Sequence, residues 1–374
     1  MIKKIIKKIL PLIPTKNIIV FESTPNLSDN TKAVFDEFIS RDFNKKYKLV
    51  WIVSKANSDL PVIENVSYCD KKRRGYKLKL LYYRIFAKAL ISCNDYLITL
   101  REGQVSFYLT HGTPIKSVKS YYTIPQNIDY ILIDGEATKK ICSYEFNADI
   151  KKFFALGFPR NDVLVNTAKD ISTLFSDKGE KIAVWYPTFR QHKNGHGNTT
   201  NNALPILHDE KQAIILNEIA KANNVILVLK PHFAQDVSKI KACNLSNIKF
   251  INDEFFIKNN ITSYEFIASC DALISDYSSV YYDYLLCNKP IGLVWEDFDE
   301  YKKTVNFAVD MDYYMKAGHK IYTIEDFEEF LKNIASSNDK LESERAEIST
   351  WANYSNDGKS SQRVVDFIIE KAKL

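Results

Sequence analysis

The sequence predicts an α/β protein built from two doubly wound parallel sheets. Short apolar runs, rich in valine, isoleucine and aromatic residues, alternate with helical patterns along the chain, as in successive βα units. The length of 374 residues is large for one domain, and an apolar content of 45% supplies enough material for two cores. We therefore expect two Rossmann-like domains with a cleft between them, and a ligand outside the carboxyl ends of the strands.

The strands are predicted in order from these apolar runs. In the first half of the chain they are 17–22, 47–53, 104–110, 129–134 and 152–156. In the second half they are 181–186, 224–230, 247–251, 271–275 and 289–294. A polar stretch at 168–180 is the best place for a boundary, which gives domains over 1–170 and 171–374. A terminal helix near 361–372 could pack on either domain.

Charge, cysteine usage and missing motifs exclude several classes of protein. A net charge of +5 is too weak to indicate a nucleic-acid partner, and the six scattered cysteines form no Cys-x-x-Cys pair. A reduced compartment therefore fits better than a disulfide framework or a zinc site. No Gly-x-Gly-x-x-Gly or Walker motif occurs, which argues against dinucleotide cofactors and P-loop chemistry. His192 and His196 flank a Gly-Asn stretch that we interpret as a loop. We expect no cofactor and no bound metal, while a need for a divalent ion and the oligomeric state stay open.

Two basic stretches predict contact with an anionic membrane surface. In 1–14, isoleucines at helical spacing face away from four lysines. In 71–94 there are eight Lys or Arg and no acid. Each such cation near an anionic leaflet contributes about 1 kcal/mol to membrane binding. Its helical apolar face consists of Leu78, Leu81, Tyr82, Ile85, Phe86 and Ala89. The alternative is ordinary amphipathic helices whose basic faces are solvated. No apolar run is long enough to span a bilayer, so we expect a peripheral protein.

Polar and cationic groups follow five of the predicted strands. Parallel strands bring such groups to one edge of a sheet, so together they predict a site for an anionic ligand. The five segments are His111-Gly112-Thr113-Pro114-Ile115-Lys116, Gly157-Phe158-Pro159-Arg160-Asn161-Asp162, Tyr186-Pro187-Thr188-Phe189-Arg190, Lys230-Pro231-His232 and Asp276-Tyr277-Ser278-Ser279.

The step at Ser278 and Ser279 lies between a strand and a helix. Its hydroxyls and free backbone N–H groups would face a phosphate at the positive end of the helix dipole. Asp283 lies about one turn further on, and we expect it to accept hydrogen bonds from ligand hydroxyls. Plain N-capping by the serines is the alternative.

These segments, in this order, resemble the CDP-glycerol glycerophosphotransferase family of teichoic acid primases, polymerases and related capsule enzymes. The segments that carry the resemblance are "HGTPIK", "GFPRND", "YPTFR", "KPH" and "SDYSSVYYD", and the match covers about 100 to 325. The resemblance implies a GT-B fold with an acceptor- and membrane-facing first domain and a CDP-donor-binding second domain. It also implies that an acceptor hydroxyl attacks the β-phosphorus of a CDP-polyol, most simply CDP-glycerol, and that CMP leaves. The acceptor would be lipid-linked or a polymer, at the cytoplasmic face of the membrane.

The resemblance also implies roles for individual residues. His111 matches the general base on the acceptor hydroxyl, a role that suits an imidazole. Lys230 and His232 would neutralise the diphosphate as CMP departs, and His232 is the second catalytic candidate. The remaining substrate-binding candidates are Thr110, Gly112, Thr113, Pro114, Arg160, Pro187, Thr188, Pro231, Ser278, Ser279 and Asp283.

One motif departs from the family pattern, because Pro231 precedes His232 where proline usually follows the histidine. Glycerol, ribitol or another polyol phosphate, and a primase, polymerase or capsule role, all stay open. Two other functions compete with polyol phosphate transfer. They are a GT-B glycosyltransferase that uses a nucleotide sugar and a non-catalytic binding protein with a decayed site.

Overall fold

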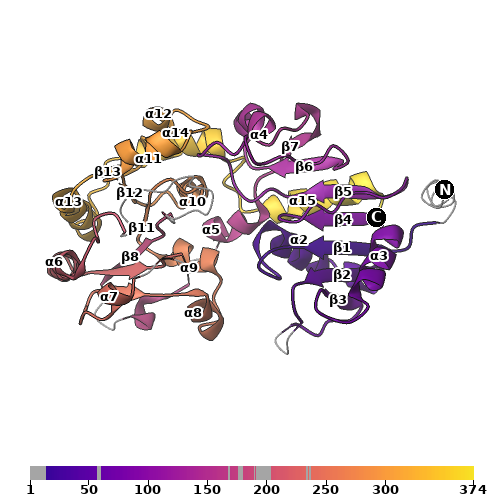
Figure 1. The fold of residues 1–374 in the computed structure, drawn as a ribbon, viewed down its shortest axis with the longest axis horizontal. Helices are drawn as coiled ribbons and strands as arrows, with labels where there is room; N and C mark the ends of the chain where they lie inside the picture. Colours follow the sequence, from indigo (N-terminus) through magenta and orange to yellow (C-terminus); the bar gives the residue numbers. More distant parts are fainter. Residues whose placement is uncertain are drawn as a thin grey trace. The chain divides into compact units, whose positions relative to one another are not determined.

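The computed structural model describes residues 14–56, 60–166, 169–175, 180–188, 190, 204–232, 235 and 237–374. It contains two parallel sheets, each within a compact unit of its own (Figure 1). Unit 1 consists of Met1–Thr113, Lys119–Asp162 and Asp357–Leu374, and unit 2 consists of Pro114–Val118 and Val163–Asn356. The predicted α/β class is confirmed.

Unit 1 holds a seven-stranded sheet in the order β3-β2-β1-β4-β5-β6-β7, with every neighbouring pair parallel. Its strands are β1 Ile18–Glu22, β2 Lys48–Val53, β3 Val66–Asp70, β4 Ala89–Ser92, β5 Val105–Tyr108, β6 Tyr130–Ile133 and β7 Phe153–Ala155. Its helices are α2 Asp29–Ser40, α3 Tyr76–Phe86, α4 Lys139–Glu145 and α15 Ser360–Ala372. Helix α5, Asp162–Asn166, begins at the last residue of the second segment of this unit.

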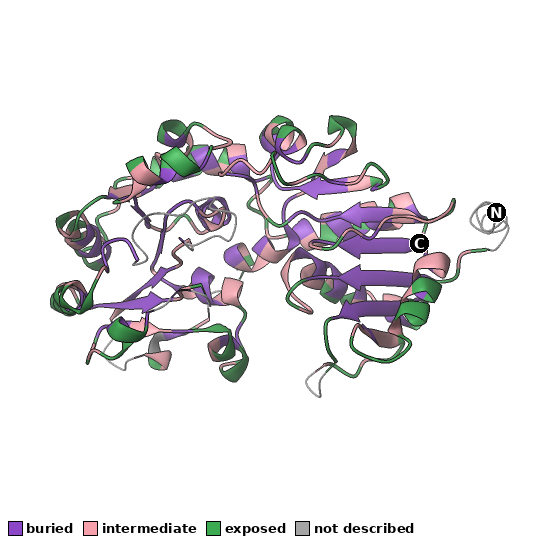
Figure 2. Ribbon diagram, viewed as in Figure 1, coloured by how far each residue is buried: buried purple, intermediate pink, exposed green. Residues whose placement is uncertain are grey.

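Both faces of the unit 1 sheet are covered. Because side chains alternate along a strand, Ile19 and Phe21 of β1 face one way, into a core shared with α2 and α15. Ile18 and Val20 face the other way, into a core that includes Tyr83 of α3. Burial on both faces explains why these strands read as continuous apolar runs (Figure 2).

Unit 2 holds a six-stranded parallel sheet in the order β10-β9-β8-β11-β12-β13. Its strands are β8 Lys181–Trp185, β9 Val225–Leu229, β10 Ile248–Phe250, β11 Ala272–Ser275, β12 Ile291–Val294 and β13 His319–Ile321. Its helices are α6 Glu210–Ala222, α7 Ser238–Lys241, α8 Asp253–Lys258, α9 Ser263–Ser269, α10 Val280–Tyr284, α11 Phe298–Thr304, α12 Met311–Tyr314, α13 Ile324–Ala335 and α14 Glu342–Ala352.

The unit 2 sheet is also doubly wound. Ala183 and Trp185 of β8 pack with α6 and α13 on one face, and Ile182 and Val184 pack with α9 and α10 on the other. Local sequence sets the helix starts: α9 and α13 each begin with a capping box, in which Thr262 and Thr323 bond reciprocally with the acid three residues later.

All ten predicted strands are present within a residue or two of their expected bounds, but three strands were missed. Strands β3 and β13 lie at sheet edges and are short or partly exposed, so they lack the apolar run that marks a buried strand. Strand β4 begins at Ala89, the last residue of the helical apolar face that was predicted within 71–94. The prediction that Ala89 belongs to a helical face is therefore wrong, because α3 ends at Phe86 and Ala87 is already extended.

The chain leaves unit 1 at Asp162 and returns to it at Asp357, so α15 packs in unit 1. The carboxylate of Asp162 accepts hydrogen bonds from the backbone N–H groups of Ser360 and Ser361, at 2.7 and 2.8 Å. These are N–H groups of the first turn of α15, which have no partner within the helix. The last two residues of the "GFPRND" segment thus have a structural use, since Asn161 also donates to Asp134.

No helix in the described part of the chain is long and apolar enough to cross a membrane. The predicted N-terminal basic helix lies almost wholly outside the described residues, as do His192 and His196.

Candidate functional site

The carboxyl ends of three neighbouring strands meet at one edge of the unit 1 sheet. Glu22 of β1 pairs with Ser92 of β4, and Ser92 pairs with Tyr108 of β5, so the three strands end level with one another. The residues that follow them, including Cys93 and His111, are therefore neighbours although they are far apart in the sequence. We call Glu22, Cys93, Thr110 and His111, with the Asp29-Asn30 pair and Arg160, the unit 1 cluster.

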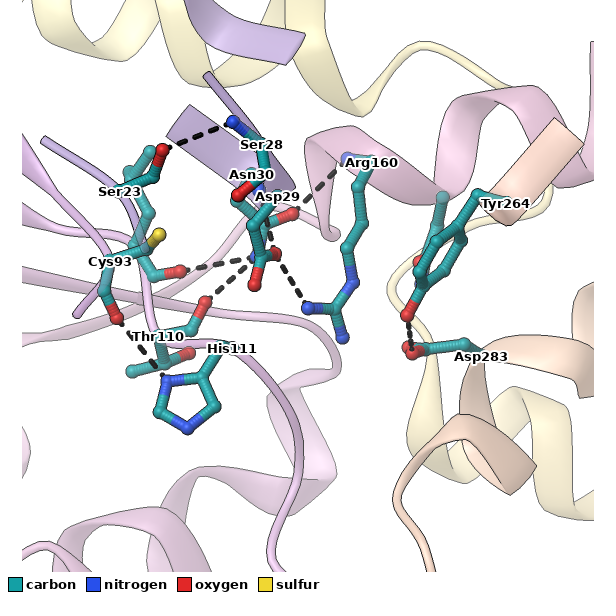
Figure 3. A network of polar contacts seen from close by, with 12 residues as sticks. Ser23, Ser28, Asp29, Asn30, Cys93, Thr110, His111, Arg160, Tyr264 and Asp283 are labelled. Atoms are coloured by element: carbon teal, nitrogen blue, oxygen red, sulfur yellow. Dashed lines mark hydrogen bonds and ion pairs between the residues drawn. The ribbon is translucent and has the colours of Figure 1, made fainter. Parts of the chain in front are cut away.

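His111 is exposed, and its ring is oriented by one backbone group. Its Nδ1 atom lies 3.2 Å from the carbonyl oxygen of Cys93 (Figure 3). Because a carbonyl oxygen can only accept, Nδ1 carries the proton of the neutral ring, and Nε2 carries the lone pair. An exposed Nε2 with a lone pair can take a proton from a hydroxyl group.

The loop that carries His111 is held by Asn30, at the start of α2. The side-chain Nδ2 of Asn30 donates to the carbonyls of Leu109 and Thr110, at 3.2 and 2.8 Å. Its Oδ1 accepts from the backbone N–H of Arg160 at 3.1 Å. Asn30 is fully buried and uses both ends of its amide, so it joins the end of β5 and the segment after β7 to α2 (Figure 3). Sequence reasoning missed this residue.

Arg160 is the second cation of the unit 1 cluster. Its Nη1 lies 2.6 Å from Oδ1 of Asp29, and the arginine side chain is only 9% exposed. The same Asp29 oxygen accepts from the backbone N–H of Asn30 at 2.7 Å. The guanidinium is thus held on α2, and its predicted part in substrate binding stays a prediction.

The other members of the His-Gly-Thr-Pro turn are less accessible. The Thr110 hydroxyl is buried and donates to the carbonyl of Leu132 at 2.8 Å. Gly112 has a φ of +155°, a conformation that residues with a Cβ rarely adopt. Thr113 and Pro114 are both buried. The structure therefore presents His111 and, partly, Gly112 to solvent, and contacts from the threonines to a ligand stay predictions.

A second group of candidates meets at the carboxyl edge of the unit 2 sheet. Leu229 of β9 pairs with Trp185 of β8, and Trp185 pairs with Ile274 of β11, so these three strands also end level. The predicted residues that follow them come together here, and we call them the unit 2 cluster: Pro187, Thr188, Lys230, Pro231, His232, Asp276, Ser278 and Ser279.

Asp276 organises this edge. Its Oδ2 accepts from the backbone N–H of Thr188 at 2.9 Å and from Nη1 of Arg190 at 2.7 Å. Its Oδ1 accepts from the Thr188 hydroxyl and from the backbone N–H of Tyr277. Both oxygens of the carboxylate therefore have two donors each, which nearly fills their capacity.

Arg190 is fully buried between two carboxylates. Besides Asp276 it binds Asp297 through Nε at 2.6 Å and Nη2 at 3.2 Å. Burial alone would lower the pKa of Arg190, but the charges of Asp276 and Asp297 outweigh it and raise the pKa. The arginine of the "YPTFR" segment thus forms a structural ion pair that fixes Thr188. Asp276 lies in a predicted segment, but its pairing with Arg190 was not predicted, and Asp297 was missed. Phe189, which lies between Thr188 and Arg190 in the sequence, is outside the described residues.

Lys230 and His232 follow β9. The Lys230 Nζ lies 3.0 Å from Oδ1 of Asp253, a largely exposed carboxylate. His232 is exposed, and its pKa is lowered by partial burial and by the nearby Lys230 ammonium. In the absence of a ligand its ring is therefore mostly neutral near pH 7.

Ser278 and Ser279 lie at the start of α10, and both are half-buried. The structure shows no side-chain cap from Ser279, so the N-capping alternative is not supported for that residue. Asp283 is buried, and one of its carboxylate oxygens accepts from the Tyr264 hydroxyl at 2.6 Å (Figure 3). Its predicted bonds to ligand hydroxyls stay a prediction.

The "HGTPIK" segment runs from one unit into the other. His111 and Thr113 belong to unit 1, whereas Pro114 and Lys116 belong to unit 2. Within the part of the chain that the structure describes, there is no group of three or more His, Cys, Asp or Glu side chains placed to hold a metal ion.

Comparisons with known proteins identify what this chain resembles. A family model described as CDP-Glycerol:Poly(glycerophosphate) glycerophosphotransferase matches residues 5–370. The teichoic acid poly(glycerol phosphate) polymerase of Bacillus spizizenii is 25% identical over 331 residues, which cover 80% of this chain and 79% of that protein. The teichoic acid ribitol-phosphate primase of the same species is 23% identical over an alignment of 397 residues, which covers 98% of this chain and 93% of that protein.

Solved structures show the same fold. The wall teichoic acid polymerase TagF matches with a TM-score of 0.70 at 22% identity, over 96% of this chain and 90% of that one. A UDP-GlcNAc 2-epimerase from Neisseria meningitidis, bound to UDP-GlcNAc, matches with a TM-score of 0.52 at 12% identity, over 94% and 99%. The predicted fold of two Rossmann-like domains is confirmed by these likenesses together with the two parallel sheets.

Proposed function

Because the chain belongs to the CDP-glycerol:poly(glycerophosphate) glycerophosphotransferase family, we propose that it transfers a polyol phosphate from a CDP-polyol to an acceptor hydroxyl. The products are a phosphodiester and CMP, and the process is the synthesis of a teichoic-acid-like or capsular polymer. Relatives named as teichoic acid polymerases and primases support phosphotransferase activity. Glycerol phosphate is our proposed group, because the family model and the polymerase of Bacillus spizizenii both carry that name.

The orientation of His111 is the observation that carries the mechanism. With Nδ1 bound to the Cys93 carbonyl, Nε2 is the basic atom, and the ring is exposed. The acceptor hydroxyl gives its proton to Nε2 while its oxygen forms a bond to the β-phosphorus of the donor. The bond from that phosphorus to the bridging oxygen breaks, and CMP leaves with this oxygen. Proton transfer of this kind contributes about 10²–10⁴-fold to the rate.

The unit 2 cluster is our proposed donor site. Lys230 supplies a cation, and Ser278 and Ser279 supply hydroxyls and backbone N–H groups at one sheet edge. Thr188 binds Asp276 through both its hydroxyl and its backbone N–H, so it shapes this edge. His232 stands beside Lys230 and is mostly neutral in the free protein, so we assign it as a hydrogen-bond donor to the diphosphate rather than a permanent charge. Positioning and charge stabilisation, rather than covalent chemistry, would supply most of the rate.

We also propose that α3 faces an anionic bilayer at the cytoplasmic side of the membrane. Leu78 is 75% exposed, Leu81 48% and Tyr82 40%, so much of the apolar face predicted for this helix is uncovered. The exposed basic residues around it are Lys72, Arg73, Arg74, Lys77 and Lys79. Exposed leucines flanked by cations are typical of helices that lie at a lipid surface.

The experiment that tests the function is nucleotide release from CDP-glycerol and CDP-ribitol, with UDP- and GDP-sugars alongside and a lipid-linked acceptor present. Liquid chromatography separates CMP from UDP and GDP. CMP from one CDP-polyol supports the proposal and identifies the polyol. Release of UDP or GDP alone would contradict it and support glycosyl transfer.

A further inference from the structure

Lys116, the last residue of the "HGTPIK" segment, is held firmly in unit 2. Its backbone forms an antiparallel bridge with Phe307. On either side, Ala308 N–H donates to the carbonyl of Ile115 at 2.8 Å, and Ser117 N–H donates to the carbonyl of Asn306 at 2.7 Å. Two hydrogen bonds flanking one residue fix where its side chain starts.

Lys116 lies near the charged groups of the unit 2 cluster. The ring of Phe307, its bridge partner, packs against the ring of Tyr277 with the centroids 5.9 Å apart, and Tyr277 directly follows Asp276. Asp276 forms the ion pair with Arg190 at the ends of β8 and β11. Partial burial lowers the pKa of Lys116, the charge of Asp276 raises it and the charge of Arg190 lowers it further, with a net decrease. The surroundings therefore leave the charged form of this lysine only partly compensated.

Asp276 does not neutralise Lys116 at contact distance. Its two oxygens already accept from Thr188, Arg190 and Tyr277, as described above. Among the described residues, no carboxylate forms an ion pair with Lys116. A half-buried cation without such a partner is costly unless an anion binds it.

We propose that Lys116 binds the diphosphate of the CDP-polyol. It would be the third side chain to do so, with the cation of Lys230 and the hydrogen-bond donor of His232. This inference rests on the proposed function. Its ammonium offers charge-assisted hydrogen bonds to phosphate oxygens. It would also stabilise the negative charge that moves onto the α-phosphate when the bond between the bridging oxygen and the β-phosphorus breaks.

The test compares Lys116→Met, which keeps most of the stem and removes the charge, with Lys116→Arg, which keeps the charge. Lys302→Met, at an exposed position of helix α11, is the matched control. Calorimetry measures the affinity of each full-length variant for CDP and for cytidine. We expect Lys116→Met to weaken CDP binding about 10- to 100-fold, with cytidine binding unchanged. Lys116→Arg should keep most of the affinity, and the control should match the wild type.

Three outcomes with the variants would overturn the inference alone. Unchanged CDP affinity in a folded Lys116→Met protein would remove Lys116 from the donor site while leaving the proposed function intact. An equal loss of cytidine and CDP binding would show a structural effect. If Lys116→Met and a second neutral variant, Lys116→Gln, both fail to fold while Lys116→Arg folds, the positive charge of Lys116 is needed to stabilise the folded protein. Failure of the wild type to bind CDP would instead overturn the proposed function, and this inference with it.

Discussion

The Nδ1 atom of His111 donates its proton to the backbone carbonyl of Cys93, 3.2 Å away. The contact joins the ends of β5 and β4, which are neighbours in the unit 1 sheet. It leaves Nε2 as the basic atom of the ring, in an exposed position. A histidine at the end of this strand is therefore oriented before any substrate arrives, which is the condition for efficient proton transfer.

Asn30 is predicted to act through His111. Replacing Asn30 with alanine removes the hydrogen-bond donor to the Leu109 and Thr110 carbonyls. The buried carbonyl oxygens then have no donor from this side chain, which should lower the free energy of unfolding by about 1–3 kcal/mol. A displacement of the His111 loop should lower kcat by up to about 100-fold and leave the affinity for CDP unchanged. Steady-state kinetics and calorimetry on Asn30→Ala test this. A variant that melts lower but keeps its kcat would show that Asn30 serves stability alone.

The exposed leucines of α3 are predicted to bind lipid. Leu78→Gln combined with Leu81→Gln should reduce sedimentation with phosphatidylglycerol vesicles several-fold, because two apolar contacts of about 1 kcal/mol or more each are lost. Ile257→Gln is the control, since Ile257 is 79% exposed on α8 of unit 2. Added salt should weaken binding of the wild type. Equal loss from both variants, or no loss from either, would contradict a membrane role for α3.

Asp162 is predicted to anchor the C-terminal helix. Asp162→Ala removes the acceptor for the N–H groups of Ser360 and Ser361 and should cost about 1 kcal/mol or more of stability. Asp366→Ala, on the exposed side of the same helix, should cost less, since its contact with Arg41 is a surface ion pair. Hydrogen exchange of the α15 amides measures both. Equal protection of α15 in the two variants would be inconsistent with this role.

Glu22 is predicted to make stability depend on pH. Burial raises its pKa from 4.5 to about 7; the backbone N–H groups of Asp95 and Asn94 and the Lys71 ammonium oppose this rise, and the Asp95 charge adds to it. Between pH about 4.5 and about 7 the folded state binds more protons at Glu22 than the unfolded state does. Its contribution to stability therefore falls as pH rises across this window and is constant above it.

Glu22→Gln stays neutral and keeps an acceptor for the N–H of Asp95, which lies 2.9 Å from the native carboxylate. The urea midpoint of the wild type should fall more than that of the variant between pH 5 and pH 8. Parallel curves for the two proteins would show that Glu22 does not titrate in this range.

The sequence predicted the buried strands and the motifs after them, because both depend on local pattern. Runs such as 224–230 are apolar throughout since both faces of each sheet are covered. Edge strands such as β3 and β13 gave no such signal, and β4 was hidden within a stretch whose cations and apolar residues fitted a helix.

The residues that hold the site could not be predicted in the same way. Asn30 is 79 and 80 residues from the carbonyls that it binds, and Asp297 is 107 residues from Arg190. Nothing in the local sequence around them indicates these partners, although "SDNT" at 28–31 is typical of a helix start. Chemistry-bearing residues at strand ends can be recognised locally, whereas the residues that position them depend on how distant segments pack.

The most direct measurement is CMP release from CDP-glycerol by the wild type, His111→Asn and a control, His208→Gln, whose ring instead contacts Glu296. We expect the wild type and the control to release CMP at similar rates. His111→Asn should be slower by about 10²–10⁴-fold, with CDP binding retained because the proposed donor contacts lie in unit 2. Undiminished CMP release by folded His111→Asn would contradict the central claim that His111 is the base.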